Sequence, residues 1–192
     1  PFFDEFTKTT GIKVNVLHAK KGLLERVISE GANTPADLVL TVDIARLSQF
    51  VQNDLLMEVS SDILNKNIPS HLRDSNNKWF ALSKRARILA VSKDRVSNNS
   101  IKNIEDLADP KWRGKICTRP GSHDYNRSLL ASIIAANGEE KAEEWASNLV
   151  LNLARKPEGN DRAQAKAVHE GVCDVAVMNT YYFGKMKFNE KN

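Results

Sequence analysis

The three tyrosines of the chain are the residues best suited to bind a metal ion. Tyr181 and Tyr182 stand side by side after the apolar run 173–178, and Tyr125 follows the β-like run 115–118 across a short turn. Each phenol therefore lies just beyond a predicted strand, where α/β proteins bind ligands. A phenolate oxygen is a hard donor that suits a hard, highly charged cation, and such a cation keeps a phenol deprotonated well below its usual pKa of about 10. The pattern favours ferric iron.

A packing role for these tyrosines stays open at this point, because a half-buried ring with a hydrated hydroxyl is the commoner use of a single Tyr. Neighbouring side chains on a regular strand point to opposite faces, so Tyr181 and Tyr182 can share an ion only if the strand ends there. The nearby Asn179, Thr180 and Gly184 favour such a change of direction, since Asn and Thr cap helices and Gly permits unusual dihedrals.

Length and composition describe a globular chain without a predicted membrane span. The chain has 192 residues, of which 41% are hydrophobic, and no apolar run approaches the roughly 20 residues of a span. Its net charge of +4 comes from Lys and Arg interleaved with Asp and Glu, which indicates solvated surface rather than a nucleic-acid site. Because it begins at Pro1, with neither an initiator Met nor a signal segment, we expect a processed, trimmed or incomplete chain.

The hydrophobic pattern alternates between helices and strands, which predicts an α/β fold. Expected helices cover or begin at 2–10, 23–28, 44–50, 104–107, 129–134, 142–153 and 160 or 161, and expected strands cover 12–16, 38–42, 115–118 and 173–178. The strand 38–42 is apolar throughout, which indicates a parallel sheet buried on both faces. The segment 79–92 is too long for an ordinary strand, so we interpret it as a crossover between two lobes that carries Arg85 and Arg87.

Two lobes joined by a crossover predict a ligand-binding cleft that closes by hinge motion. The loop 120–125 adds an anion site to this prediction, because Gly121 and Ser122 are expected at the start of a helix with free N–H groups. Arg119 beside them can pair with the same anion.

Other chemistries are weaker. The sequence Ser122-His123-Asp124 holds the residue types of a catalytic triad, but adjacent side chains diverge, and His123 is better explained as a polar loop residue. The other histidines lack the spacing of a metal site, and the chain has no glycine-rich phosphate motif. No enzyme is predicted. Cys117 and Cys173 are compatible with free core thiols or with a disulfide between adjacent strands.

Six segments together closely resemble the periplasmic ferric-iron-binding proteins of bacterial ABC-type iron importers. These segments are 10–14, 35–43, 84–87, 119–126, 159–162 and 179–184, and the resemblance covers essentially the whole chain. It implies an α/β, two-lobed type II periplasmic solute-binding fold of the transferrin-like class, truncated at both ends. Residues 1–90 would form an incomplete first lobe, 91–180 the second lobe, and 181–192 the return crossover and the start of the remainder of the first lobe.

The resemblance also implies a ligand set. Tyr125, Tyr181 and Tyr182 correspond to iron ligands, and an arginine of the segment 84–87, with Arg85 favoured, corresponds to a residue that balances phenolate charge. Relatives hold water or a synergistic anion such as carbonate at the loop of Arg119 and Ser122.

This chain departs from the family at its ends, because the first strand, which usually carries another tyrosine and in some members a histidine, is absent. We therefore expect it to bind ferric iron less tightly than a complete relative. The resemblance implies a monomeric, non-catalytic periplasmic receptor that captures ferric iron and delivers it to an inner-membrane ABC permease. A receptor for another small anion or for ferrous iron, and a hydrolase built on the loop of Ser122, stay as alternatives. Neighbouring strand starts and an oxidising compartment predict a Cys117–Cys173 disulfide.

Overall fold

The computed structural model describes residues 2–19 and 21–189, which form two compact units. Unit 1 holds the residues up to Ser61 together with Asp74–Trp79, and unit 2 holds Asp62–Arg73 together with the residues from Phe80 onward. The lobe boundaries expected from the sequence stay a prediction, and residues 190–192 of the expected return crossover lie outside the described residues.

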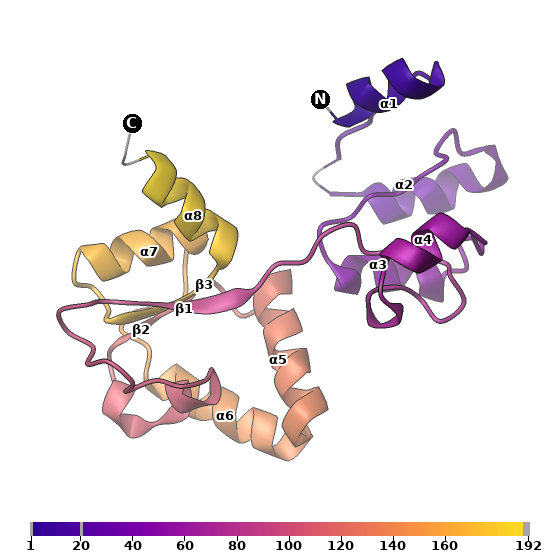
Figure 1. The fold of residues 1–192 in the computed structure, drawn as a ribbon. Helices are drawn as coiled ribbons and strands as arrows, with labels where there is room; N and C mark the ends of the chain where they lie inside the picture. The colour runs from indigo at the N-terminus through magenta and orange to yellow at the C-terminus, as the bar shows by residue number, and fades with distance from the viewer. Residues whose placement is uncertain (1, 20, 190–192) are drawn as a thin grey trace. The chain divides into compact units, whose positions relative to one another are not determined.

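Unit 1 is built from short helices and loops. Its helices are α1 (Phe2–Thr10), α2 (Leu23–Glu30), the 3-10 turn η1 (Gly31–Asn33) and α3 (Ile44–Gln52) (Figure 1). Asp43 caps α3 by accepting a hydrogen bond from the Ala45 N–H at 3.0 Å, and Gly31 ends α2 with a positive φ of 53°. The helices expected in this part of the sequence are therefore confirmed.

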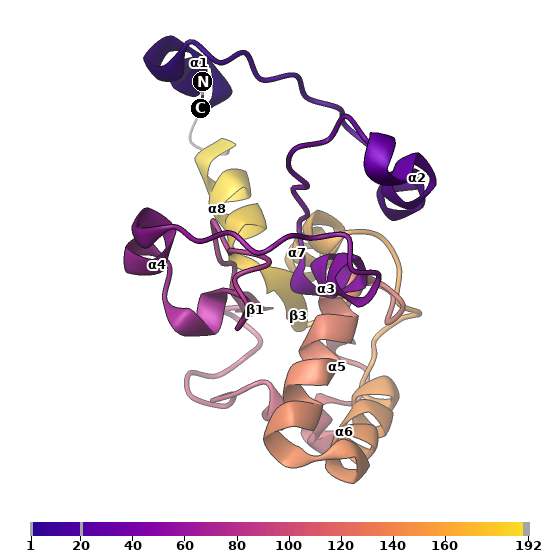
Figure 2. The same cartoon turned by 90° about the vertical axis from the view of Figure 1, so that its right-hand side faces the viewer.

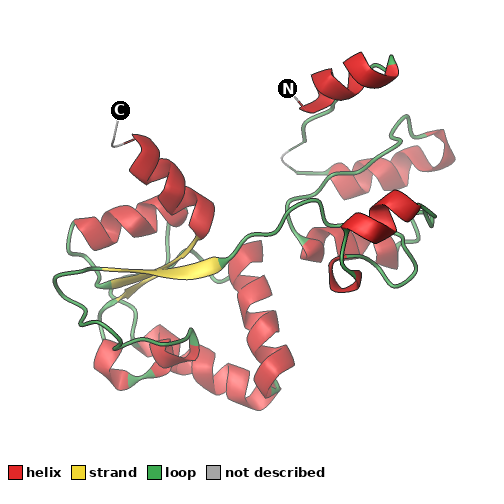
Figure 3. Cartoon of the chain, in the orientation of Figure 1, coloured by secondary structure: helices red, strands yellow, loops and turns green. Residues whose placement is uncertain are grey.

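The two strands expected in unit 1 are wrong. The segments 12–16 and 38–42 lie outside any strand, and Figure 3 shows strands only in unit 2 among the described residues. Leu38, the first residue of the expected buried run, is 92% exposed, and Leu40 in its middle is 71% exposed. A strand is stabilised by hydrogen bonds to a neighbouring strand, and the described residues of unit 1 supply none to either segment. The expected parallel sheet through 38–42 is wrong for the same reason.

Unit 2 is built on a three-stranded mixed sheet. Its strands are β1 (Arg87–Val91), β2 (Ile116–Cys117) and β3 (Val175–Asn179), in the order β1-β3-β2. The central β3 is buried along its whole length, pairs antiparallel with β1 and runs parallel to β2. The expected long crossover 79–92 is thus a regular strand only over β1, where β3 supplies its hydrogen-bond partners.

Eight helical elements complete the described part of unit 2. They are α4 (Asp62–Asn67), η2 (Ser70–Leu72), η3 (Glu105–Ala108), η4 (Pro110–Trp112), α5 (Asp124–Asn137), α6 (Glu139–Leu151), α7 (Asp161–His169) and α8 (Thr180–Asn189). Figures 1 and 2 place α7 along one side of the sheet and α6 on the other. The main apolar core joins Leu107, Ile116 and Val175, all fully buried. Within the described residues, no helix is long and apolar enough to cross a membrane.

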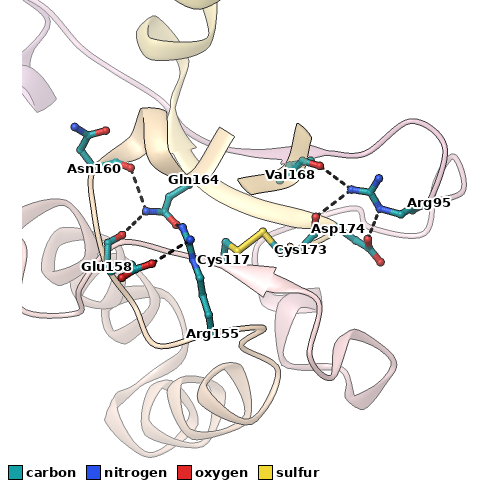
Figure 4. Close-up of a disulfide and its surroundings, with 9 residues drawn as sticks. All are labelled: Arg95, Cys117, Arg155, Glu158, Asn160, Gln164, Val168, Cys173 and Asp174. Atoms are coloured by element: carbon teal, nitrogen blue, oxygen red, sulfur yellow. Dashed lines mark hydrogen bonds and ion pairs between the residues drawn. A yellow bond between two sulfur atoms is a disulfide. The ribbon is translucent and has the colours of Figure 1, made fainter. Parts of the chain in front are cut away.

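A disulfide ties β2 to the segment just before β3. Cys117 and Cys173 are both buried, and their Cα atoms are 5.9 Å apart. Figure 4 shows the bridge beside Arg95, which pairs with Asp174 at 2.6 Å and donates to the carbonyls of Val168 and Cys173. The predicted disulfide is confirmed, because parallel pairing of β2 with β3 brings these distant segments together.

Candidate metal-binding site

The end of β3 places two phenols next to each other. β3 ends at Asn179 and α8 begins at Thr180, so Tyr181 and Tyr182 lie in the first turn of α8. Their ring centroids are 4.2 Å apart, with an angle of 33° between the ring planes. Consecutive side chains on a continuing strand would have pointed to opposite faces, whereas the strand-to-helix turn keeps these two rings in contact.

The third phenol comes from the first turn of α5. His123 precedes this helix, and its imidazole Nδ1 accepts a hydrogen bond from the Tyr125 N–H at 3.1 Å, which caps the helix. The Tyr125 Oη lies 3.2 Å from the Tyr181 Oη. The structure therefore gathers Tyr125, Tyr181 and Tyr182 in unit 2, and these three residues are called the tyrosine cluster below.

Three arginines surround the Tyr125 ring. Arg85 donates from Nη1 to the Tyr125 Oη at 3.2 Å, and its guanidinium carbon lies 5.3 Å from the ring centroid. The corresponding distances are 4.9 Å for Arg119 and 5.6 Å for Arg87, both in the range of cation–π contacts. Of the two arginines in the segment 84–87, Arg85 is the one that contacts a phenol oxygen.

A fourth arginine, Arg162, was not predicted. It lies in the first turn of α7, and its guanidinium carbon is 5.2 Å from the Tyr182 ring centroid. Among the described residues, no group of three or more His, Cys, Asp or Glu side chains could hold a metal ion. The donor set of the tyrosine cluster is therefore phenolic, and cationic side chains surround it.

Hydrogen bonding separates the pKa values of the three phenols. The hydrogen bond from Tyr182 to Tyr181, together with burial, raises the pKa of Tyr182 to about 12. Burial and the hydrogen bond to Tyr181 raise the pKa of Tyr125. Burial also opposes ionisation of Tyr181, but hydrogen bonds from Tyr125 and Tyr182 outweigh it and lower the pKa of Tyr181. Tyr181 is therefore the first phenol of the cluster to lose its proton.

Asp161 is a functional candidate that sequence reasoning missed. Its carboxylate is fully buried and pairs with Arg87 at 2.8 Å and with Arg119 at 3.1 Å. It also accepts a hydrogen bond from the backbone N–H of Asn179 at 2.8 Å. The sequence predicts Asn160 or Asp161 as a helix cap, and Asn160 takes that role in the structure. One signal in the sequence could have identified Asp161. It is the acidic residue of the segment 159–162, and that segment is one of the six on which the family resemblance rests.

The anion site expected at the loop 120–125 stays a prediction, and the structure shows where its residues lie. Arg119 is buried and reaches the Tyr125 ring, but Ser122 is exposed. The helix α5 begins at Asp124, three residues after Gly121 and two after Ser122, so the expectation that these two residues open the helix is wrong. Within the described part of the chain, no hydrogen bond joins Ser122 to the tyrosine cluster.

Comparisons with known proteins identify relatives of the whole chain. The chain is 46% identical over 189 residues to iron uptake protein A1 of Synechocystis, and 30% identical over 186 residues to the major ferric iron-binding protein of Neisseria meningitidis. These alignments cover 98% and 94% of this chain but 52% and 54% of the relatives. The chain therefore spans about half the length of the curated relatives it matches.

Solved structures similar to this chain are also of iron-binding proteins. Ferric iron-binding protein A of Mannheimia haemolytica, in an open conformation, matches with a TM-score of 0.92 and 48% identity over 100% of this chain and 61% of its own. A Trichodesmium protein in complex with iron and citrate ligands matches with a TM-score of 0.93 and 46% identity over 97% of this chain and 59% of its own. The predicted type II solute-binding fold is thereby confirmed.

A family model supplies the remaining evidence. Residues 33–192 match the model described as bacterial extracellular solute-binding protein, a family of transport proteins and not of enzymes. The chain belongs to the bacterial extracellular solute-binding protein family.

Proposed function

We propose that this chain is the part of a periplasmic solute-binding protein that ligates ferric iron through Tyr125, Tyr181 and Tyr182. The observation that carries the proposal is the 3.2 Å separation of the Tyr125 and Tyr181 hydroxyls, with Tyr182 stacked on Tyr181. Phenolates are hard anionic donors, and three of them balance the charge of Fe³⁺. Two relatives are named as ferric iron-binding proteins, which supports ferric iron as the bound cation.

The arginines around the cluster favour ionised phenols. Arg85 donates to the Tyr125 hydroxyl, and a nearby positive charge stabilises a phenolate relative to a phenol. Arg119 and Arg87 add positive charge on the Tyr125 ring, and Asp161 compensates for only part of it. The resulting excess of positive charge favours an anion beside the iron.

That anion is carbonate or a small carboxylate, held by Arg119 with the loop of Ser122. Arg119 supports this proposal because its Nε is buried without a hydrogen-bond partner among the described residues. Guanidinium groups bind carboxylates through paired N–H donors, so a free donor beside the tyrosines suits such an anion. The citrate bound with iron in the Trichodesmium relative is an anion of this chemical class.

The family suggests where this chemistry is used. Membership of the extracellular solute-binding family supports a role in the periplasm. There the protein would act as a monomer and pass iron to the inner-membrane permease of an ABC importer. Uptake and release then follow from a ligand-dependent shift between conformations.

Titration with chelated ferric iron, followed by visible spectroscopy, tests the proposal. A phenolate-to-iron charge-transfer band is expected on addition of iron, weaker or shifted in Tyr125→Phe, Tyr181→Phe and Tyr182→Phe. Phe183→Leu is the matched control, because Phe183 follows Tyr182 on α8, is 50% exposed and has no phenol oxygen. A wild-type chain that gives no band at any iron concentration, or three Phe variants with unchanged bands, would rule out tyrosinate ligation.

A second candidate function is the binding of a small anion without iron. The observation in its favour is that four guanidinium groups lie within about 6 Å of the tyrosine rings, at cation–π distance. Their positive charge would attract an anion even without iron. Calorimetry with carbonate and citrate in iron-free buffer separates the two functions. Anion binding that is unaffected by iron, and by the Phe variants, favours the second candidate.

A further inference from the structure

Asp161 contacts three residues that lie next to the tyrosine cluster. Its Oδ2 accepts from Arg87 Nη1 at 2.8 Å and from the Asn179 N–H at 2.8 Å, and its Oδ1 accepts from Arg119 Nη1 at 3.1 Å. The carboxylate has no exposed surface. A buried carboxylate is costly unless paired, so these three donors stabilise it and the loss of any one is expected to be destabilising.

The Asn179 contact fixes the turn that carries two phenols. Asn179 is the last residue of β3, and Tyr181 and Tyr182 follow it after one residue. The Asn179 side chain accepts a further hydrogen bond from Arg87 Nη1 at 3.1 Å, so Asp161 and Arg87 hold both its backbone and its side chain. These contacts therefore hold the residue from which α8 leaves the sheet.

The arginine contacts fix the third phenol. Arg119 is 8% exposed and lies over the Tyr125 ring, and its guanidinium is oriented by Asp161. Arg87 also donates to the Asn126 side chain at 2.7 Å, next to Tyr125 on α5. Asp161 thus acts on Tyr125 from α5 and on Tyr181 and Tyr182 from α8, without contacting a phenol oxygen.

We infer that Asp161 is a positioning residue that sets the distance between the phenol of α5 and the two phenols of α8, and thereby the affinity of the cluster for a trivalent cation. The cation part of this inference rests on the proposed function, whereas the positioning part does not. Removing a partner that orients metal ligands typically weakens metal affinity roughly ten- to hundredfold.

The variant Asp161→Asn tests the inference, with Asp174→Asn as a matched control. Asp174 lies just before β3, whereas Asp161 contacts the end of that strand. Asp174 pairs with Arg95 at 2.6 Å (Figure 4). Its amide variant also removes one carboxylate from an arginine, but at the end of β3 opposite to the one that leads to Tyr181.

Hydrogen exchange on the iron-free chain measures positioning directly. In Asp161→Asn, the amides of residues 179–182 are expected to exchange at least about tenfold faster, while those of 175–177 on the same strand stay protected. Asp174→Asn should leave residues 179–182 unchanged. Equal acceleration along the whole strand, or no local acceleration, would show that Asp161 contributes only to general stability.

Iron titration measures how the loss of Asp161 changes the affinity of the tyrosine cluster for iron. Asp161→Asn is expected to bind iron roughly ten- to hundredfold more weakly with a shifted charge-transfer band, whereas Asp174→Asn keeps the wild-type band and affinity. The double variant Asp161→Asn with Arg119→Gln should lose less affinity than the sum of the losses in the two single variants. The reason is that Asp161→Asn alone leaves the Arg119 guanidinium without its carboxylate partner, and the second substitution removes that guanidinium. Additive losses, or wild-type binding by Asp161→Asn, would overturn the inference.

Two further outcomes are also decisive. If the wild-type chain gives no iron band, the proposed function fails, and the exchange experiment alone decides whether Asp161 positions the turn. If Asp161→Asn shows no cooperative thermal transition, the double variant takes its place in both experiments. Failure of that variant to fold as well would make Asp161 a stability residue and overturn the inference.

Discussion

The hydroxyl oxygens of Tyr125 and Tyr181 lie 3.2 Å apart, although the residues are separated by 56 positions in the sequence. At this distance one hydroxyl donates to the other, so a cation that binds both must displace the proton between them. The same hydrogen bond lowers the pKa of Tyr181 and raises that of Tyr125. The proposed binding of a metal ion by both oxygens would therefore release this proton.

Absorbance titration of the iron-free chain is expected to give well-separated phenol ionisations. Tyr181 should ionise below the usual pKa of about 10, and Tyr182 should ionise last, with a pKa of about 12. In Tyr125→Phe, the pKa of Tyr181 should rise, because a hydrogen bond that stabilises its phenolate is lost. Three overlapping ionisations near pH 10 would contradict this order.

Iron affinity is expected to rise with pH. Tyr125 and Tyr182 have raised pKa values, so both hold their protons at neutral pH and must release them when iron binds. Each released proton makes binding tighter as pH increases and weaker as pH falls. Chelator competition between about pH 6 and 8 tests this expectation, because both groups stay protonated in the free chain over that interval. An affinity independent of pH would argue against phenolate ligands.

Replacement of Arg85 should weaken iron binding without unfolding the chain. Arg85 is exposed and donates to the Tyr125 hydroxyl, so Arg85→Gln removes a charge that favours the phenolate. We expect a loss of roughly tenfold in affinity and a higher pKa for Tyr125. Arg85→Lys should retain part of the effect, and Lys84→Gln, one residue earlier, should behave like the wild type. Equal losses in Lys84→Gln and Arg85→Gln would indicate a general charge effect.

Local signals explain which helices could be predicted from the sequence. Asp43, Asn160 and Gly138 mark helix ends through hydrogen bonds and dihedral angles of adjacent residues, and all three occur at helix ends in the structure. The strand-to-helix change before Tyr181 is of the same kind, because it depends on the few residues after β3.

Features that depend on distant partners could not be predicted in this way. The segment 38–42 has the apolar pattern of a buried strand, but a strand also needs a neighbour, which the described residues of unit 1 do not supply. Asp161 is similar, since its partners Arg87 and Arg119 are 74 and 42 residues away and its role follows from their arrangement in space. The pairing of Cys117 with Cys173 was predictable because it involved only two residues.

Reduction of the disulfide should destabilise unit 2 without abolishing the tyrosine cluster. The bridge joins residues 56 positions apart, for which the loss of chain entropy on cross-linking corresponds to about 4 kcal/mol. A lower urea midpoint is expected under reducing conditions, with the iron band retained in the folded state. The variant with Cys117→Ala and Cys173→Ala should not respond to reductant. Two free thiols in the denatured, non-reduced chain would contradict the bridge.

Gly159 should be sensitive to substitution, because it introduces the turn before Asn160 and Asp161. Its φ of +66° is in the left-handed region, and an added Cβ would lie 2.8 Å from the Ala163 Cβ. Gly159→Ala therefore combines backbone strain with a steric contact against α7, and we expect about 1–3 kcal/mol of lost stability in urea unfolding. Displacement of α7 would also move Asp161, so weaker iron binding should accompany the loss.

Gly121→Ala is the matched control for that variant. Gly121 lies in the turn before α5, in the same unit, and an added Cβ there has no heavy atom within 4 Å. Its stability should change by less than about 0.5 kcal/mol, as for most surface substitutions. If Gly121→Ala and Gly159→Ala have equal effects, the cost comes from general loop stiffening. A selective effect of Gly159→Ala on both stability and iron affinity would link the turn at residue 159 to the geometry of the tyrosine cluster.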